Sequence, residues 1–289
     1  MKVSGFTFIR NAEKFDYPIV EAIQSILPIC DEFIVMAGNS DDRTNELIKS
    51  INSDKIRIFQ SVWDDNLRTG GRVLAEETNK AFSKIASDST WAFYIQADEI
   101  LHEEFLPIVQ NAMLKWKDDA SVEGLLFNYR HFYGSYDYVG DSTRWYRKEV
   151  RIIRNNPSIK SFRDAQGFRI NDRPLKVKQV DATMFHYGWV KPPDKQQAKQ
   201  KQFHRLWHND EKVNKIVGQD DDFDYSVIDS LSHFTGAHPA VMKDRIARQN
   251  WKFSFDPTLK RLSVKSRFKL FIEKYTGWRV GEYKNYRLI

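Results

Sequence analysis

The sequence predicts an α/β protein built around a mixed, mostly parallel sheet that is flanked by helices. Hydrophobic residues make up 41% of the 289-residue chain and charged residues 29%, which is typical of a globular protein with a sizeable core. In the first half, short apolar segments alternate with segments of helical periodicity. The short segments are apolar almost throughout, as strands are when both faces of a parallel sheet are buried.

The first two strands and the helix between them follow from local composition. Residues 3–9 are apolar and rich in β-forming residues, and residues 33–36 form a second apolar run. Asp16 and Pro18 predict a helix start, because the first turn does not need the N–H that proline lacks. Four apolar residues then lie on one face of a helix that ends near Leu27, namely Ile19, Ala22, Ile23 and Ile26.

The rest of the first half repeats this pattern. A polar loop precedes each of the next two predicted helices. In chain order we expect a loop at 38–42, a helix at 44–51, a strand at 56–59, a loop at 64–71, a helix at 73–86 and a strand at 91–95. Alternation of this kind predicts a Rossmann-like sheet, and ligands of such sheets bind outside the carboxyl ends of the strands.

The pattern changes after residue 120. Leu125, Phe127 and Tyr129 alternate with polar residues, as in a half-exposed strand, and residues 150–154 and 175–180 also have strand character. Residues 194–215 are polar and helical in character. We therefore expect one domain over 1–255, with a first half at 1–120 and a mixed second half at 121–255. Residues 256–289 form a basic, aromatic extension.

Charge and cysteine content limit the class of protein. The formal net charge is +6, which suits a nucleotide diphosphate or an anionic membrane surface. The basic residues are spread out and carry no recognition motif, so we expect no nucleic-acid partner. The single cysteine, Cys30, excludes an intrachain disulfide, and no run of 18 apolar residues occurs. We expect a cytoplasmic protein that touches the inner face of a membrane at most peripherally.

Two acids directly follow the fourth predicted strand. Asp98 and Glu99 come after Gln96 and Ala97, at the carboxyl edge of the sheet. Carboxylates in this position can hold a hard divalent cation that bridges substrate phosphates. Alternatively, Asp98 or Glu99 stabilises the start of the next helix through its dipole.

Two glycine-containing loops come at the same predicted edge. The loop at 38–44 offers a tight turn and polar groups for a base or ribose, and its Ser40 or Asp42 can also cap the following helix. The loop at 66–72 has two glycines, with Arg68 and Arg72 as phosphate partners ahead of a helix. It lacks the lysine and hydroxyl residue of a P-loop, so an ordinary NTPase is disfavoured.

The second half contains three sets of histidines. His186 lies in a rigid segment with Lys191, where the histidine could bind a metal and the lysine a phosphate, or His186 could be structural. His204 and His208 are four residues apart, but the residues between them favour a surface helix over a zinc site. His233 and His238 carry no distinguishing pattern.

Taken together, the order of these features resembles glycosyltransferase family 2, whose members have the nucleotide-sugar-binding GT-A fold. The resemblance covers roughly residues 1–130. It rests on a first strand that runs into a polar turn at 7–13, an acidic Gly/Ser loop after the second strand, and an asparagine in the third helix. It rests also on the metal motif after the fourth strand, where Gln96 replaces the first acid and Asp98 retains the second.

The resemblance implies a divalent cation, Mn²⁺ or Mg²⁺, and a nucleotide-sugar donor, with a UDP-sugar expected. It assigns Asp98 and the late histidine, His186, to the metal. It assigns a larger set to the donor: Thr7, Ile9, Asn11, Gly38, Asn39, Ser40, Asp42, Arg72, Asn79, Gln96, Ala97 and Lys191. The implied reaction transfers a sugar to a hydroxyl of a glycan, a lipid-linked or another acceptor with inversion.

The second half should supply the base and the acceptor site. Asp164 lies in a glycine-containing loop and is the candidate base, with Asp141 as the alternative. The aromatic residues that could stack on sugars or pack the core are Tyr133, Tyr136, Tyr138, Trp145 and Tyr146. Because Gln96 departs from the motif, a nucleotide- or glycan-binding protein without turnover is the alternative function.

The extension contains a basic segment at 260–272 with near-helical apolar spacing. Such a helix could lie on an anionic membrane that holds lipid-linked acceptors, or it could dock on the body of the protein. The sugar, the acceptor and the oligomeric state do not follow from the sequence.

Overall fold

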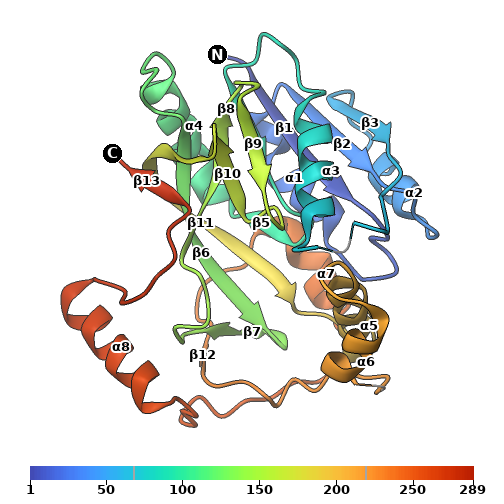
Figure 1. Cartoon of the computed structure of the whole chain (residues 1–289), viewed down its shortest axis with the longest axis vertical. Helices are drawn as coiled ribbons and strands as arrows, with labels where there is room; N and C mark the ends of the chain where they lie inside the picture. The colour runs from blue at the N-terminus through green and yellow to red at the C-terminus, as the bar shows by residue number, and fades with distance from the viewer. Residues whose placement is uncertain (68, 219) are drawn as a thin grey trace.

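The alternation of apolar strands and helices builds a mixed sheet in the computed structural model, which describes residues 1–67, 69–218 and 220–289 (Figure 1). The strand order is β3-β2-β1-β4-β8-β6-β11-β10-β9. The first strands are β1 (Val3–Ile9), β2 (Glu32–Ala37), β3 (Ile56–Gln60) and β4 (Trp91–Tyr94). These four are parallel, which confirms the Rossmann-like first half.

The second half extends the same sheet. Strand β8 (Lys148–Arg154) pairs antiparallel with both β4 and β6 (Gly124–Tyr133), and β6 pairs parallel with the long β11 (Arg173–Trp189). The remaining strands are β5 (Glu99–Leu101), β7 (Ser135–Gly140), β9 (Ile159–Phe162), β10 (Gly167–Ile170), β12 (Leu231–His233) and β13 (Tyr286–Leu288). The predicted fold class, a GT-A-type α/β arrangement, is confirmed.

Helices cover both faces of the sheet in the first half. The α-helices are α1 (Ile19–Ile26), α2 (Thr44–Lys49), α3 (Arg72–Phe82), α4 (Leu106–Trp116), α5 (Pro193–Arg205), α6 (Asp210–Val217), α7 (Lys243–Ala247) and α8 (Val264–Thr276). Short 3-10 helices are η1 (Leu27–Ile29), η2 (Glu103–Phe105) and η3 (Ala240–Met242). Among the described residues, none of these helices has both the length and the apolar character to cross a membrane.

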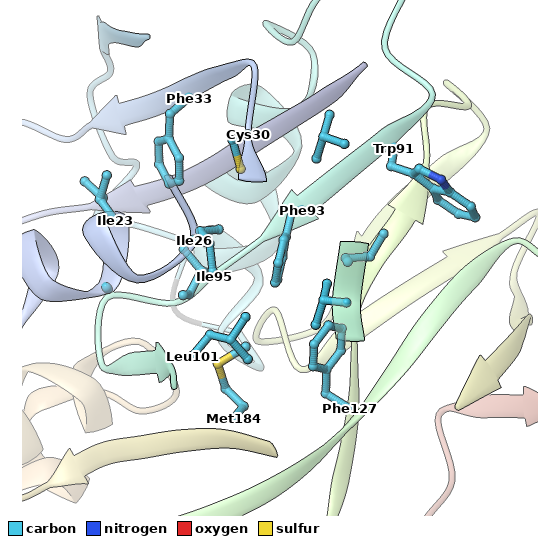
Figure 2. Close-up of a cluster of buried hydrophobic side chains, with 14 of the residues drawn as sticks. Ile23, Ile26, Cys30, Phe33, Trp91, Phe93, Ile95, Leu101, Phe127 and Met184 are labelled. Carbon is cyan, nitrogen blue, oxygen red and sulfur yellow. The ribbon is translucent and has the colours of Figure 1, made fainter. Parts of the chain in front are cut away.

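Two buried clusters show why the strands are apolar throughout. On one face, Phe33 and Phe93 pack with α1 and α4 (Figure 2). On the other face, Ile34 and Tyr94, their neighbours in sequence, pack with α3 and with β9 and β10. Successive strand residues point to opposite faces, so a strand with a core on both sides needs apolar residues at every position.

The predicted elements of the first half are confirmed with small boundary changes. The third helix ends at Phe82 rather than near Ala86, and the first ends at Ile26 and continues as a 3-10 turn. A helix after Asp98 and Glu99 was expected only as an alternative, without bounds; this helix is α4, which begins after β5 and η2 rather than at the two acids. It packs Val109 and Met113 against the first cluster and lies between β5 and β6 in the chain.

Candidate functional site

A pocket of about 300 Å³ opens at the carboxyl ends of β1 and β4. The turn at 163–166, the end of β11 and the helix α5 complete its walls. The pocket therefore lies where a Rossmann-like sheet binds its ligands. Among the residues that the sequence singled out, those that line it are Ile9, Asn11, Gln96, Ala97, Asp98, Tyr146, Asp164 and His186.

A buried ion pair holds the loop that carries Asp98. Both carboxylate oxygens of Glu99 accept hydrogen bonds from Arg151, at 2.7 and 2.8 Å, and Glu99 Oε1 also accepts one from the Tyr129 hydroxyl at 2.7 Å. Glu99 Oε2 accepts a further bond from the backbone N–H of Gln96 at 3.1 Å. Because both charges are buried and fully hydrogen-bonded, the second predicted acid has a structural role that fixes the turn at 96–99.

Asp98 faces the pocket beside a lysine that the sequence did not single out. Lys199 Nζ lies 3.0 Å from Asp98 Oδ2 and donates a second bond to the Gly188 carbonyl at 2.8 Å. Burial disfavours the charged form of Asp98, but the nearby charge of Lys199 outweighs it and holds the pKa of this carboxyl well below its usual range. Asp98 is therefore an anion at neutral pH.

The tautomer of His186 is set by a second histidine. His131 Nε2 lies 2.7 Å from the Tyr146 carbonyl, which can only accept, so this nitrogen carries the proton. The other nitrogen of neutral His131 then accepts from His186 Nδ1, at 3.0 Å. Burial lowers the pKa of both rings, which favours the neutral forms. His186 Nε2 is left with a free lone pair, 3.8 Å from Asp98 Oδ1.

Gly188 is required by the close approach of these groups. A Cβ at this position would lie 2.7 Å from both Asp98 Oδ2 and His186 Nε2. The backbone of β11 thus passes directly against the two predicted metal ligands. The Tyr187 N–H donates to the Asp98 carbonyl at 2.8 Å, which ties the two loops together.

Two further carboxylates line the pocket. Asp164 Oδ1 is buried without a hydrogen-bond partner in the described part of the chain, and burial raises the pKa of Asp164. Burial also raises the pKa of Glu149 to about 8. A carboxyl group with a raised pKa in a pocket is a candidate for proton transfer.

The predicted nucleotide loop does not line the pocket, but it contacts Asn11 and Trp63, which do. Ser40 Oγ accepts from the Asn11 N–H at 3.0 Å, and Asn11 Oδ1 accepts from the Asp41 N–H at 2.9 Å. Gly38 leaves room for Trp63, because a Cβ on Gly38 would lie 2.5 Å from the indole nitrogen. Trp63 lines the pocket with Arg10, whose guanidinium lies 5.6 Å from the ring centre. The indole nitrogen is buried without a partner among the described residues.

Several predicted donor residues lie beside the pocket rather than in its lining. Thr7 ties β1 to β4 by donating to the Ile95 carbonyl at 2.6 Å, and Asn39 accepts from the Trp63 N–H at 3.2 Å. Asp42 accepts from the Thr44 N–H at 3.1 Å, so it stabilises the start of α2. Asn79 accepts from the Ser161 N–H at 2.7 Å. These four side chains position the walls of the pocket.

Three predicted residues are not brought to the pocket. Arg72 is exposed at the start of α3. Lys191 is buried, with its ammonium 2.6 Å from the Asp16 carbonyl and 4.4 Å from the Tyr17 ring centre. Asp141 forms an ion pair with Lys260 at 2.6 Å and accepts from Ser230. Arg68, the other arginine of the glycine loop, lies outside the described residues.

Most of the predicted sugar-stacking aromatic residues are in the core. The buried members are Tyr133, Tyr136, Tyr138 and Trp145, whereas Tyr146 is partly exposed and lines the pocket. His204 and His208 stack at 6.1 Å at the end of α5. No group of three or more His, Cys, Asp or Glu side chains in the described ranges is arranged to hold a metal ion.

Comparisons with known proteins give only distant matches. No protein-family model matches the chain, and no curated protein matches it. Among solved structures, glucosyl-3-phosphoglycerate synthase from Mycobacterium tuberculosis, in complex with Mn²⁺, UDP and phosphoglyceric acid, is similar with a TM-score of 0.30 and 18% identity. That match covers 46% of this chain and 43% of the synthase chain, which is less than half of the synthase.

A second solved structure is that of residues 1–349 of TarS from S. aureus. It is similar with a TM-score of 0.38 and 14% identity, over 75% of this chain and 69% of the TarS chain. UDP and a divalent cation, the ligands that the family resemblance implies, are present in the synthase complex.

Proposed function

We propose that the pocket binds a nucleotide sugar, with a UDP-sugar as the expected donor, and transfers its sugar to a hydroxyl acceptor. The observation that supports this most is the convergence of Asp98, His186 and Asp164 in one pocket at the carboxyl ends of the parallel strands. The half at 1–120 contributes Asn11 and Asp98, and the half at 121–255 contributes Asp164 and His186. Donor and acceptor would meet between these halves.

Asp98 and His186 suit a divalent cation that is shared with the donor. Their facing atoms, Oδ1 and the free Nε2, are 3.8 Å apart, and His131 fixes the ring of His186 as a partner of a metal-binding histidine does. Mg²⁺ and Mn²⁺ sites often have only one or two protein ligands, with substrate phosphates and water completing the shell. A bound cation would neutralise charge on the departing diphosphate.

Asp164 is the proposed base. Its unpaired Oδ1 can accept the proton of the acceptor hydroxyl while that oxygen forms a bond to the anomeric carbon. The bond from this carbon to the diphosphate oxygen breaks, and its electron pair leaves with the diphosphate. A single displacement inverts the anomeric configuration. A raised pKa makes Asp164 a better proton acceptor once it is ionised.

The first experiment is calorimetric titration of UDP and of GDP into the protein, with and without Mn²⁺. We expect UDP to bind and Mn²⁺ to strengthen that binding. In Asp98→Ala the affinity for UDP in the presence of Mn²⁺ should fall by about 10- to 100-fold. Asp141→Ala is the matched control, because Asp141 is also paired with a lysine but lies outside the pocket. Equal loss in both variants would contradict the proposed site.

Transfer is tested separately from binding. Asp164→Asn should bind UDP like the wild type but lose hydrolysis and transfer of UDP-sugars by about 10²–10⁴-fold, measured as UDP release with a panel of glycan and lipid-linked acceptors. UDP binding without turnover in the wild type would instead support a nucleotide-binding protein. Failure of both nucleotides to bind would contradict both functions.

A further inference from the structure

The helix α8 turns its apolar side away from the protein. Its apolar residues recur at spacings of four and three, and the members of this exposed row are Val264, Phe268, Phe271, Tyr275 and, just beyond the helix, Trp278. Val264 is 85% exposed and Tyr275 69% exposed. Figure 1 shows α8 at one corner of the molecule, apart from the helices α5 to α7. A row of this size on a surface usually marks an interaction site.

The opposite side of α8 contacts the body through polar groups. Glu273 lies 3.2 Å from Arg147 and 4.0 Å from Arg279. The half-buried residues of the helix include Ser266 and Leu270, on the same side as Glu273. A helix that docks on a core buries its apolar side, whereas α8 exposes it. Packing of α8 on the rest of the chain therefore does not explain the apolar row.

The charges beside the apolar row select its partner. Lys265, Arg267 and Lys274 flank the row, and the single acid within α8, Glu273, faces the body. If two copies paired through this row, the cations of one would lie beside those of the other, which disfavours self-association. An anionic surface is attracted by the same cations while its apolar interior accepts the aromatic side chains.

We propose that α8 binds the surface of an anionic lipid bilayer, with Phe268 and Phe271 inserted among the acyl chains and Lys265 and Lys274 at the phosphates. Tyr275 and Trp278 suit the boundary between lipid and water, where aromatic rings with a polar edge are enriched. This docking is independent of the proposed transfer reaction. It makes the chain a peripheral protein whose binding responds to salt.

The test uses the full chain in flotation assays with vesicles of phosphatidylcholine alone or mixed with phosphatidylglycerol. We expect binding only to the mixed vesicles, weakened by added salt. Phe268→Ser/Phe271→Ser should reduce the partition coefficient by more than about tenfold. Lys265→Gln/Lys274→Gln should reduce it by roughly tenfold. Leu114→Ser, an exposed apolar site on α4, is the control and should bind like the wild type.

Three results would overturn the proposal. The first is that the wild type fails to bind either vesicle, and the second is that Phe268→Ser/Phe271→Ser binds the mixed vesicles as tightly as the wild type. The third is concentration-dependent dimerisation that Phe268→Ser/Phe271→Ser abolishes and that added vesicles do not inhibit. This result would assign the row to a second copy of the chain. Circular dichroism and thermal unfolding of each variant show whether the fold is intact, so the result does not depend on the fate of the proposed reaction.

Discussion

Lys199 competes with any cation for Asp98, since its ammonium lies 3.0 Å from Oδ2. Replacing it by methionine should tighten Mn²⁺ binding to the nucleotide-free protein by roughly tenfold or more, because two positive charges a few ångströms apart repel by more than about 1.4 kcal/mol. Titration followed by the electron paramagnetic resonance of free Mn²⁺ measures this. Lys201→Met is the control, because Lys201 donates instead to the Asp220 carbonyl. Weaker binding in Lys199→Met would show that the lysine supports the metal site.

Glu149 should make the folded state less stable at alkaline pH. Burial raises its pKa from 4.5 to about 8, so the native state holds this proton over a pH range in which the unfolded chain has released it. The free energy of unfolding therefore falls as pH rises from about 4.5 to about 8. In Glu149→Gln this part of the fall should be absent, a difference on the order of a few kcal/mol at pH 8.

Urea unfolding of wild type and variant across this range measures the effect of Glu149. The difference between the two proteins, rather than either curve alone, isolates this carboxyl from other titrating groups. Parallel curves at all pH values would show that Glu149 is already ionised in the folded protein at neutral pH.

The Glu99–Arg151 ion pair, both of whose side chains are buried, joins β5 to β8, and the Tyr129 hydroxyl links β6 to the same carboxylate. Glu99→Gln keeps the volume but leaves the Arg151 charge uncompensated, so we expect a loss of about 3–5 kcal/mol in the free energy of unfolding. Arg173→Gln breaks the exposed pair with Glu123 and should cost little. Chemical denaturation compares the two, and equal losses would mean that burial of the pair is unimportant.

The elements of the first half could be predicted because both faces of β1, β2 and β4 are buried, whereas β3 lies at the edge of the sheet and is half-buried. Phe33 and Ile34 point to different clusters, so neighbouring positions must both be apolar. The strand therefore appears in the sequence as a continuous apolar run. Asp98 and Gln96 could be placed at the pocket for the same reason, since they directly follow such a run. The bounds of α4 were missed, although its Val109 and Met113 are four residues apart on one face.

The second half of the site could not be predicted, because tertiary contacts decide it. Lys199 is one of several lysines in a polar helix, and only the packing of α5 beside β11 selects it. Glu149 and Lys148 are adjacent, and the register of β8 decides which of them lines the pocket. Tyr133 and Trp145 are aromatic, as residues that stack on sugars are. However, β7 and β12 cover them, so they belong to the core.

The C-terminal extension, residues 256–289, contributes a strand to the sheet. Strand β13 pairs in parallel with β11, with Leu175 opposite Tyr286, and Tyr286 packs on the second cluster. The chain thus leaves the body to form α8 and then returns to it (Figure 1).

The contact between Glu273 and Arg147 has a consequence for how an acceptor would be found. Arg147 directly follows Tyr146, which lines the pocket, so α8 is attached next to the rim where the acceptor would enter. A protein held on a bilayer through α8 would search for a lipid-linked acceptor by diffusion in two dimensions rather than three. Its rate would then depend on the number of acceptors per area of membrane, and detergent that disperses the acceptor would slow an enzyme whose pocket is unchanged.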